Sequence, residues 1–334
     1  MESILFIALI VSFLATFLVL PFWIRKTKQI GLIWEDMNKL NSEKVAGSGG
    51  IAVVLGFTFG VLVYIAIKTF YFNSPENLVE IFALLIVILL VSGIGLVDDL
   101  FGWHHGGLSV KSRIIFVLLS AVPLMVINVG TPEIYVPFVG VVNIGIIYAL
   151  FFIPIAILGT TTTFNFLAGH NGLEASQGIL VLGALAIMSW INGTSWLSLI
   201  VLCMIASLIA FLYFNKYPAK VFPGDVLTYA VGAMIAIMAI LGNYEIFAVF
   251  IFIPYIFEVV LKSRGRLKKA SFGEPQSDGS IKNKYNKIYG LEHLAIRILE
   301  KIKPSKKAYE WEVVLLINAF QLAIIIFAFL IYIF

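Results

Sequence analysis

Charged residues are scarce in this chain. Asp, Glu, Lys and Arg make up 13% of its 334 residues, against about a quarter in a typical soluble domain. Hydrophobic residues account for 60%, and apolar runs long enough to cross about 30 Å of hydrocarbon recur along nearly the whole length. This balance excludes an ordinary soluble domain. The net charge of +4 follows from membrane topology, so no nucleic-acid partner is expected.

Cysteine is almost absent. Cys203 is the single cysteine and lies inside an apolar run, which excludes an intrachain disulfide and leaves no companions for a zinc or redox site. The first apolar segment, 3–23, is too long for a signal-peptide core and has no basic residues before it. It is therefore predicted to be a retained first span. No internal repeat and no low-complexity tract is apparent.

The predicted fold is an all-α integral membrane protein that forms one polytopic domain over 1–334. The ten predicted spans are 3–24, 46–69, 79–97, 112–130, 141–163, 174–192, 195–214, 226–242, 244–262 and 312–334. With both termini outside, Lys68 is the only one of 23 Lys and Arg residues on the outer face. This agrees with the excess of basic residues in cytoplasmic loops.

The longest cytoplasmic loop is predicted to run from 263 to 311. Within it, Leu291, Leu294, Ile298 and Ile302 recur at helical spacing, with charged residues between them. This pattern is typical of a helix that lies in the membrane interface. A helix packed beneath the bundle explains the pattern equally well.

Aspartate is also rare, since the chain has only five aspartates, and three of them fall where apolar segments meet the cytoplasm. Asp98 and Asp99 follow the third span. Adjacent carboxylates repel each other unless a cation, a lysine or a shared proton compensates them. The pair therefore suggests metal binding or general-base chemistry on a charged substrate. The alternative is a solvated helix end.

Two further polar clusters lie at the same face. Asp225 follows a Pro-Gly turn just before the eighth span, where it either takes part in a site or caps the helix. The second cluster runs from Asn165 to Glu174 and contains two glycines, which permit tight backbone geometry beside amide and carboxylate groups. Such a loop either cradles a polar ligand or is a plain turn.

Basic residues from separate segments complete the cytoplasmic face: Lys39, Lys44, Lys111, Arg264 and Arg266. Each alone is explained as a positive-inside anchor. Beside several carboxylates, they suggest a pyrophosphate, whose clustered negative charge is held by arginine, lysine and a hard divalent cation. Oxygen ligands from Asp and Asn suit Mg²⁺ or Mn²⁺, whereas the chain lacks the Cys and His spacing of a zinc site.

Taken together, these motifs resemble the polyprenyl-phosphate N-acetylhexosamine 1-phosphate transferases. The resemblance begins at Asp36-Met37-Asn38-Lys39, reaches the last span, and is strongest to the archaeal and eukaryotic UDP-N-acetylglucosamine–dolichyl-phosphate branch. The resemblance rests on the order of the motifs and on their shared cytoplasmic placement. Two positions depart from the family pattern: Asp98-Asp99-Leu100-Phe101-Gly102 lacks a third polar residue, and His170 stands where an aliphatic residue is frequent.

The resemblance implies an enzyme that moves a sugar 1-phosphate from a UDP-N-acetylhexosamine to a polyprenyl or dolichyl phosphate and releases UMP. In this family the step begins lipid-linked glycan assembly, with protein N-glycosylation as the expected destination, and needs Mg²⁺. The implied catalytic residues are Asp98, Asp99 and Lys111. The implied metal ligands are Asn165 and Asp225. The implied substrate-binding residues are Met37, Asn38, Lys39, Lys44, Asn171, Glu174, Phe222, Arg264 and Arg266.

Two other functions remain open. A secondary transporter would use the cytoplasmic carboxylates as ion sites, although such sites usually lie near the bilayer midplane. A catalytically silent scaffold would use the motifs as helix caps. The expected location is the cell membrane, or the endoplasmic reticulum membrane in a eukaryote, with the site facing the cytoplasm. The sequence leaves open whether the chain forms a homodimer.

Overall fold

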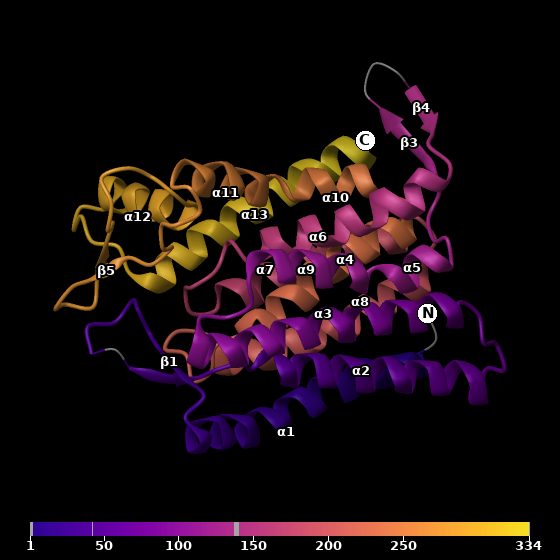
Figure 1. Cartoon of the computed structure of the whole chain (residues 1–334), viewed down its shortest axis with the longest axis horizontal. Coiled ribbons are helices and arrows are strands. Elements are labelled where there is room, and N and C mark those ends of the chain that lie inside the picture. Colours follow the sequence, from indigo (N-terminus) through magenta and orange to yellow (C-terminus); the bar gives the residue numbers. More distant parts are fainter. Residues whose placement is uncertain (1–2, 42, 137–139, 334) are drawn as a thin grey trace.

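Helices form most of the computed structural model, which describes residues 3–41, 43–136 and 140–333 (Figure 1). The long helices are α1 (Phe6–Ile30), α2 (Gly50–Ala66), α3 (Leu78–His105), α7 (Leu173–Ile191), α8 (Ser195–Asn215), α9 (Gly224–Gly242) and α13 (Glu310–Ile333). The shorter helices are α4 (Val110–Ser120), α5 (Val122–Val126), α6 (Ile153–Phe164), α10 (Glu245–Ile251), α11 (Ile253–Arg264) and α12 (Leu291–Ile302). Short helical segments η1 (Ser3–Leu5), η2 (Ile67–Tyr71) and η3 (Tyr148–Phe152) adjoin them.

Seven helices among the described residues are long and apolar enough to cross a membrane, and α10 with α11 makes eight if this pair is one span. That pair is bent by 56°. The bend follows from Pro254, which lies at the start of α11 and cannot donate a helical hydrogen bond. The predicted spans 112–130 and 141–163 correspond to shorter helices, so a total of ten spans stays a prediction.

The centre of the bundle is α9, in which 83% of the apolar window is buried, against 28% in α1 and in α13. At the periphery, α2 packs closely on α1 because Gly56 and Gly60 share one helical face. A Cβ atom at Gly60 would lie 1.7 Å from the Ser12 hydroxyl, so only glycine permits this approach. Small residues at four-residue spacing commonly allow membrane helices to approach closely, and here the Thr16 hydroxyl also donates to the Ala52 carbonyl at 3.3 Å.

Three short antiparallel hairpins were not expected from the sequence. They pair β1 (Ile33–Glu35) with β2 (Lys44–Ala46), β3 (Glu133–Val136) with β4 (Gly140–Asn143), and β5 (Glu274–Pro275) with β6 (Ile281–Lys282). The predicted spans 46–69 and 141–163 were therefore wrong at their starts, since strands occupy their first residues and the helices begin later. Local apolar content alone does not separate a short strand from the end of a span.

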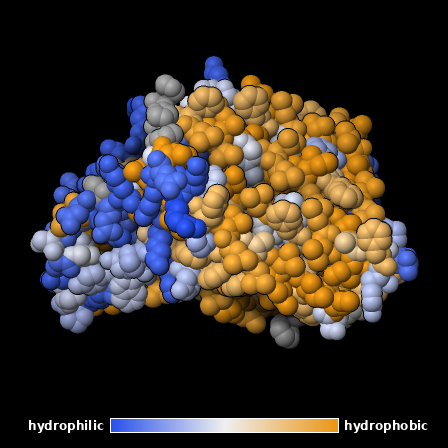
Figure 2. Space-filling model, turned by 90° about the horizontal axis from the view of Figure 1, so that it is seen from below, coloured by the Kyte–Doolittle hydropathy of each residue, from blue (hydrophilic) through white to orange (hydrophobic). Residues whose placement is uncertain are grey.

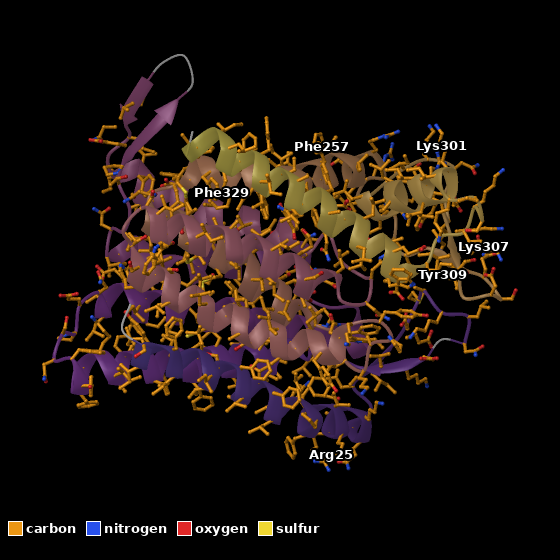
Figure 3. The ribbon with its side chains drawn as sticks, turned by 180° about the vertical axis from the view of Figure 1, so that it is seen from behind. Arg25, Phe257, Lys301, Lys307, Tyr309 and Phe329 are labelled. Carbon is orange, nitrogen blue, oxygen red and sulfur yellow. The ribbon has the colours of Figure 1, made fainter. Side chains whose placement is uncertain are left out.

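Polar residues gather at one end of the molecule. In Figure 2, hydrophilic side chains cover the end at which Figure 1 places α12, β1 and β5, and hydrophobic side chains cover most of the remainder. Both chain termini lie toward the opposite end. In Figure 3, Arg25, Lys301 and Lys307 lie at the polar end, whereas Phe329 of α13 lies far from it.

The helix predicted in the long loop is confirmed as α12, which packs against α11 and α13. Its buried residues include Leu291, Ala295 and Ile296, whereas Ile302 at its end is 74% exposed. Packing against the bundle thus accounts for one side of its apolar pattern. Leu294 and Ile298 line an apolar groove of about 540 Å³ between these three helices.

Candidate active site

The site is built where three distant segments meet at the polar end. The loop before α2 is joined to the loop before α9 by main-chain hydrogen bonds. The Phe222 amide donates to the Ala46 carbonyl at 2.8 Å, and the Gly49 amide donates to the Phe222 carbonyl at 2.8 Å. Helix α3 approaches the same point, because a Cβ atom at Gly95 would lie only 2.6 Å from the main chain of Asp225. These contacts fix the residues around Asp225.

Asp99 is held between these loops. Its carboxylate accepts a hydrogen bond from the Ser48 hydroxyl at 2.8 Å and another from the Asp225 amide at 2.9 Å. Gly224 adopts a left-handed conformation with φ of 71°, and a Cβ atom there would lie 2.2 Å from an Asp99 oxygen. Glycine is therefore required at this turn for two reasons, backbone conformation and space.

Asp98 is also buried and has its own partners. One oxygen accepts from the Leu108 amide at 2.6 Å, and the other lies 2.9 Å from Nε of Arg113. Because α3 continues to His105, the two aspartates lie within its last turns and are 4% and 7% exposed. The third span was predicted to end at 97, and a solvated helix end is excluded.

The positive charge beside Asp98 comes from Arg113, which the sequence did not single out. Lys111, the predicted catalytic lysine, is exposed at the start of α4. Both residues follow the turn at Gly106 and Gly107, and the first turn of α4 directs Arg113 back toward α3. The basic residue in contact with the acidic pair is thus Arg113, and the catalytic role of Lys111 that the resemblance implies stays a prediction.

Asp225 and Asn165 lie side by side. The Asn165 amide donates to the Asp225 carboxylate at 3.2 Å, and the Thr228 hydroxyl donates to the Asn165 oxygen at 3.1 Å. The cap residue of α9 is Pro223, so Asp225 does not cap the helix by its side chain. The Asp225 carboxyl also interacts electrostatically with Asp98 and Asp99. We call these three aspartates the acid cluster.

The side chains of the acid cluster and Asn165 include oxygen atoms that could bind a divalent cation. No three His, Cys, Asp or Glu side chains within the described ranges come together as a ready-made metal site. Mg²⁺ needs no such group, because it is commonly held by one or two carboxylates, waters and substrate phosphates. Asp225 and Asn165 supply the oxygen donors that Mg²⁺ prefers, and the single arginine at the cluster, Arg113, pairs with Asp98 among the described residues. The donor chemistry therefore fits.

A cavity of about 300 Å³ opens beside Asp225 and Asn165. Its lining includes the aromatic side chains of Trp34, Phe222 and Phe272. Of the predicted substrate-binding residues, Met37, Glu174 and Phe222 line it. The lining also includes Asp36, His170, Asn215 and Thr228. Carboxylate, amide and aromatic groups thus surround a single space of ligand size.

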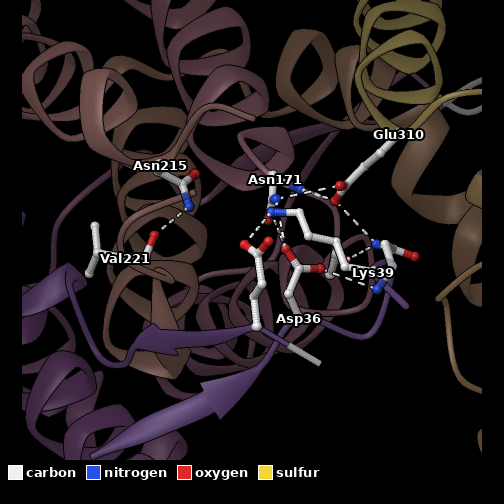
Figure 4. Close-up of polar contacts among 9 residues, drawn as sticks. Asp36, Lys39, Asn171, Asn215, Val221 and Glu310 are labelled. Carbon is white, nitrogen blue, oxygen red and sulfur yellow. Dashed lines mark hydrogen bonds and ion pairs between the residues drawn. The ribbon is translucent and has the colours of Figure 1, made fainter. Parts of the chain in front are cut away.

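A second buried polar network lies at the edge of the cavity, and we call Asp36, Asn38, Asn171 and Glu310 the clasp (Figure 4). The Asn171 side chain donates to Asp36 at 3.0 Å, and its main-chain amide donates to Glu310 at 2.7 Å. Asn38 donates to the Gly169 carbonyl at 3.0 Å. The clasp ties the β1–β2 loop, the α6–α7 loop and the start of α13 together.

The predicted substrate-binding residues therefore fall into three groups: those that line the cavity, those in or beside the clasp, and those that are exposed. Asn38 and Asn171 are 5% and 4% exposed, and their hydrogen-bonding groups are engaged inside the clasp. Lys39 lies 3.2 Å from Asp36, beside the same network. Exposed basic residues make up the rest of the set: Lys44, Arg264 and Arg266. The structure does not bring these three side chains into the cavity lining.

Sequence reasoning missed several contributors. Ser48 lies in the run Gly47-Ser48-Gly49-Gly50, and the density of small residues was a usable sign of a close approach. Glu310 carried no signal, because its partners are more than 130 residues away along the chain. Phe272 contacts the cavity from the long loop, where a ring could not be placed by sequence spacing.

The loop that carries Phe272 is anchored by a buried charged group. Lys262 lies 3.5 Å from Glu258 and contacts the Ser271 hydroxyl, while Glu258 accepts from the Leu291 amide at 2.6 Å. Glu292 is fully buried next to them, and burial raises its pKa well above the usual range. This arrangement fixes the ends of the segment from Ser271 to Leu291 against α11.

Comparison with known proteins gives a consistent result. Residues 81–243 match the model of glycosyl transferase family 4. A Saccharolobus solfataricus protein, named provisionally as a UDP-N-acetylglucosamine–dolichyl-phosphate N-acetylglucosaminephosphotransferase, is 34% identical over 87% of this chain and 87% of its own. The Dictyostelium discoideum protein of that name is 28% identical over 73% of this chain and 67% of its own. A phospho-N-acetylmuramoyl-pentapeptide-transferase of Halalkalibacterium halodurans is 27% identical over 78% of this chain and 82% of its own.

Proposed function

Because the chain belongs to glycosyl transferase family 4, we propose that it transfers N-acetylglucosamine 1-phosphate from UDP-N-acetylglucosamine to a dolichyl or other polyprenyl phosphate, releasing UMP. The observation that carries the proposal is the cavity that opens beside Asp225 and Asn165, next to buried Asp98 and Asp99. The reaction would be the first membrane step of lipid-linked glycan assembly. The names of the relatives from two domains of life support this choice of substrates.

The reaction breaks one bond and forms one. An oxygen of the lipid phosphate attacks the phosphorus that carries the sugar, and the bond from that phosphorus to UMP breaks. The products are a lipid-linked sugar pyrophosphate, which contains the lipid phosphate and the sugar phosphate, and UMP, which keeps the third phosphate. Phosphate monoesters have a second pKa near about 6, so the nucleophile is largely ionised at neutral pH. Positioning and charge stabilisation should therefore contribute more than proton removal.

The chain's own residues would supply that positioning. Asp225 and Asn165 would hold Mg²⁺, which when bound polarises the pyrophosphate and offsets its charge. Arg113 holds Asp98 in place, and Ser48 with the Asp225 amide holds Asp99. Both oxygens of Asp99 and one oxygen of Asp98 accept hydrogen bonds, and the other Asp98 oxygen is ion-paired with Arg113, so both side chains are preorganised. Such fixed groups act without reorganising during the reaction.

The polar end of the molecule would face the cytoplasm, where nucleotide sugars are found, and ten crossings would place both termini outside. The basic residues Arg25, Lys301 and Lys307 lie at that end, which supports this orientation (Figure 3). A site at the membrane surface also suits an acceptor whose polyprenyl tail stays in the bilayer. Whether the enzyme works as a homodimer is decided by its mass in detergent or nanodiscs.

The direct test uses purified protein in nanodiscs with UDP-N-acetylglucosamine, a polyprenyl phosphate and Mg²⁺. The proposal predicts UMP release that requires all three and stops on addition of EDTA. Parallel reactions with other UDP-sugars define the donor. Absence of UMP with every UDP-sugar would overturn the proposal, and flux of a solute across sealed vesicles without UMP would favour a transporter instead.

A further inference from the structure

The cavity wall includes a short segment of the long cytoplasmic loop that is held at both ends. Lys262 contacts the Ser271 hydroxyl, and the Gly273 amide donates to the side-chain oxygen of Asn38 at 3.0 Å. Between these two contacts, Phe272 lines the cavity. The tripeptide therefore runs from the lysine of α11 to the clasp, with its aromatic ring in the cavity wall.

The Phe272 ring packs against a second part of the same wall. A Cβ atom at Gly169 would lie 2.7 Å from this ring. The Gly169 amide in turn donates at 2.9 Å to Glu174, which also lines the cavity. A displacement of the segment at Ser271 would therefore change the shape of the cavity where Phe272 meets the 169–174 loop.

Lys262 is fixed by a buried carboxyl group. Its side chain is 12% exposed, and its ammonium nitrogen lies 3.5 Å from Glu258, which is fully buried one helical turn earlier in α11. Glu258 also accepts a hydrogen bond from the Leu291 amide at the start of α12, at 2.6 Å. Two helices thus determine where the ammonium group lies, so the contact with Ser271 joins the mobile end of a loop to a rigid part of the fold.

A second carboxyl group lies next to Glu258. A Cβ atom at Gly290 would lie 2.4 Å from a Glu292 oxygen and 2.9 Å from a Glu258 oxygen. Burial, together with the Glu258 carboxyl, raises the pKa of Glu292 well above the usual range, which favours its neutral, protonated form. With Glu292 neutral, Lys262 and Glu258 form a balanced ion pair, and the ammonium group keeps further N–H donors for Ser271.

We propose that Lys262 is a positioning residue for the reaction: it holds Ser271 and so keeps Phe272 in the wall of the cavity that binds the UDP-sugar. This inference rests on the proposed function. Within the described part of the chain, Lys262 is not in the cavity lining, so it acts through the segment and not by touching the substrate. Because Phe272 belongs to the lining and not to the acid cluster, Lys262 affects binding of the UDP-sugar more than the chemical step.

The test compares KM and kcat for UMP release in three variants. Lys262→Met keeps the length of the side chain but removes its charge, and should raise KM for the UDP-sugar about 5- to 30-fold with kcat within about threefold of the wild type. Ser271→Ala breaks the same contact without unpairing Glu258, and should raise KM about 3- to 10-fold. Lys268→Met, at an exposed lysine of the same loop, is the matched control and should behave like the wild type.

The double variant, with Lys262→Met and Ser271→Ala together, tests whether the two residues act as one unit. Its KM should equal that of Lys262→Met alone, because the contact can be lost only once. Hydrogen exchange, measured without substrate, should be faster at residues 271–274 in both single variants than in the wild type. The Gly273 amide reports this, since its bond to buried Asn38 protects it only while the segment stays in place.

Three results would overturn the inference: an unchanged KM in Ser271→Ala, a KM in the double variant equal to the product of the two separate effects, or a fall in kcat at unchanged KM. Ser271→Ala decides the question if Lys262→Met does not fold. Unchanged exchange at 271–274 in an active enzyme would overturn the positioning role alone. A wild type that releases no UMP would overturn the proposed function and, with it, the effect on KM.

Discussion

The acid cluster and the clasp use the same kinds of side chain, carboxylates and amides, at the same end of the molecule. In the clasp, Asp36 and Glu310 each accept several hydrogen bonds, and Lys39 adds a positive charge. In the acid cluster, Arg113 pairs with Asp98, Asp99 accepts hydrogen bonds from neutral groups, and Asp225 accepts from Asn165 at the cavity wall. The carboxylates of the clasp have hydrogen-bond and ion-pair partners within the network, whereas the three carboxylates of the acid cluster carry more negative charge than Arg113 can offset and could bind a further cation.

This difference indicates that the clasp stabilises the fold and that the acid cluster takes part in the reaction. A buried carboxylate with enough donors contributes to fold specificity, whereas a group of carboxylates with too little compensating charge favours binding of a cation. Residue type alone does not distinguish the two cases. The comparison therefore predicts that isosteric changes in the acid cluster lower activity, and that the same changes in the clasp lower stability.

The largest effect is expected at Asp225. Asp225→Asn keeps the size of the side chain but removes its charge, which should reduce the rate of UMP release by about 10²- to 10³-fold or more. Circular dichroism and the melting temperature should stay close to those of the wild type. Activity within a factor of three of the wild type would remove Asp225 from the metal site.

The next effect distinguishes Arg113 from Lys111. Arg113→Gln leaves Asp98 without its cation and should lower UMP release about 10- to 100-fold, while Lys111→Gln, at an exposed site, should cost less. Arg113→Lys should recover only part of the activity, because lysine cannot reproduce the arginine geometry. A larger loss at Lys111 than at Arg113 would favour the sequence-based assignment over the ion pair.

A smaller effect, on stability, is expected in the clasp. Glu310→Gln exchanges a carboxylate oxygen for an amide nitrogen beside groups that donate, which should destabilise the protein by about 1–3 kcal/mol. The catalytic rate of the folded fraction should change little. Thermal unfolding and UMP release, measured on one preparation, check this. A large loss of rate at unchanged stability would move Glu310 into the substrate site.

The smallest effect is a pH dependence at α12. Burial lowers the pKa of His293 to about 4, so between pH 6.5 and 4 the unfolded chain binds a proton that the folded protein does not. Acidification across this window should therefore favour unfolding. His293→Gln should lose less melting temperature than the wild type between pH 7 and pH 5. Parallel curves for the two proteins would contradict a buried neutral His293.

The helical bundle and the polar face could be predicted, because long apolar runs and loop charges directly reflect the bilayer. Asp98, Asp99, Asn165 and Asp225 were also placed correctly at one location. The ion pair of Arg113 with Asp98 was not predictable, since it depends on the turn before α4. Glu310 joins Asn171 across 139 residues, and no local pattern reports such a contact.

The β1–β2 hairpin and the bend before α11 escaped prediction for different reasons. The bend depends on Pro254 within an otherwise apolar segment, so a hydropathy window averages it away. The hairpin lies in a polar loop, where strands of three residues are too short to give a periodic signal, and its last residue, Ala46, was predicted to begin a span. These features nevertheless matter, because the hairpin brings Asp36 and Met37 to the cavity.

The most direct test of the difference between the two clusters is ligand-induced thermal stabilisation. The melting temperatures of wild type, Asp225→Asn and Glu310→Gln are measured with and without Mg²⁺ plus UMP. Ligand should raise the melting temperature of the wild type and of Glu310→Gln, and should leave that of Asp225→Asn almost unchanged. A full shift in Asp225→Asn, with none in Glu310→Gln, would contradict the assignment of chemistry to the acid cluster and of structure to the clasp.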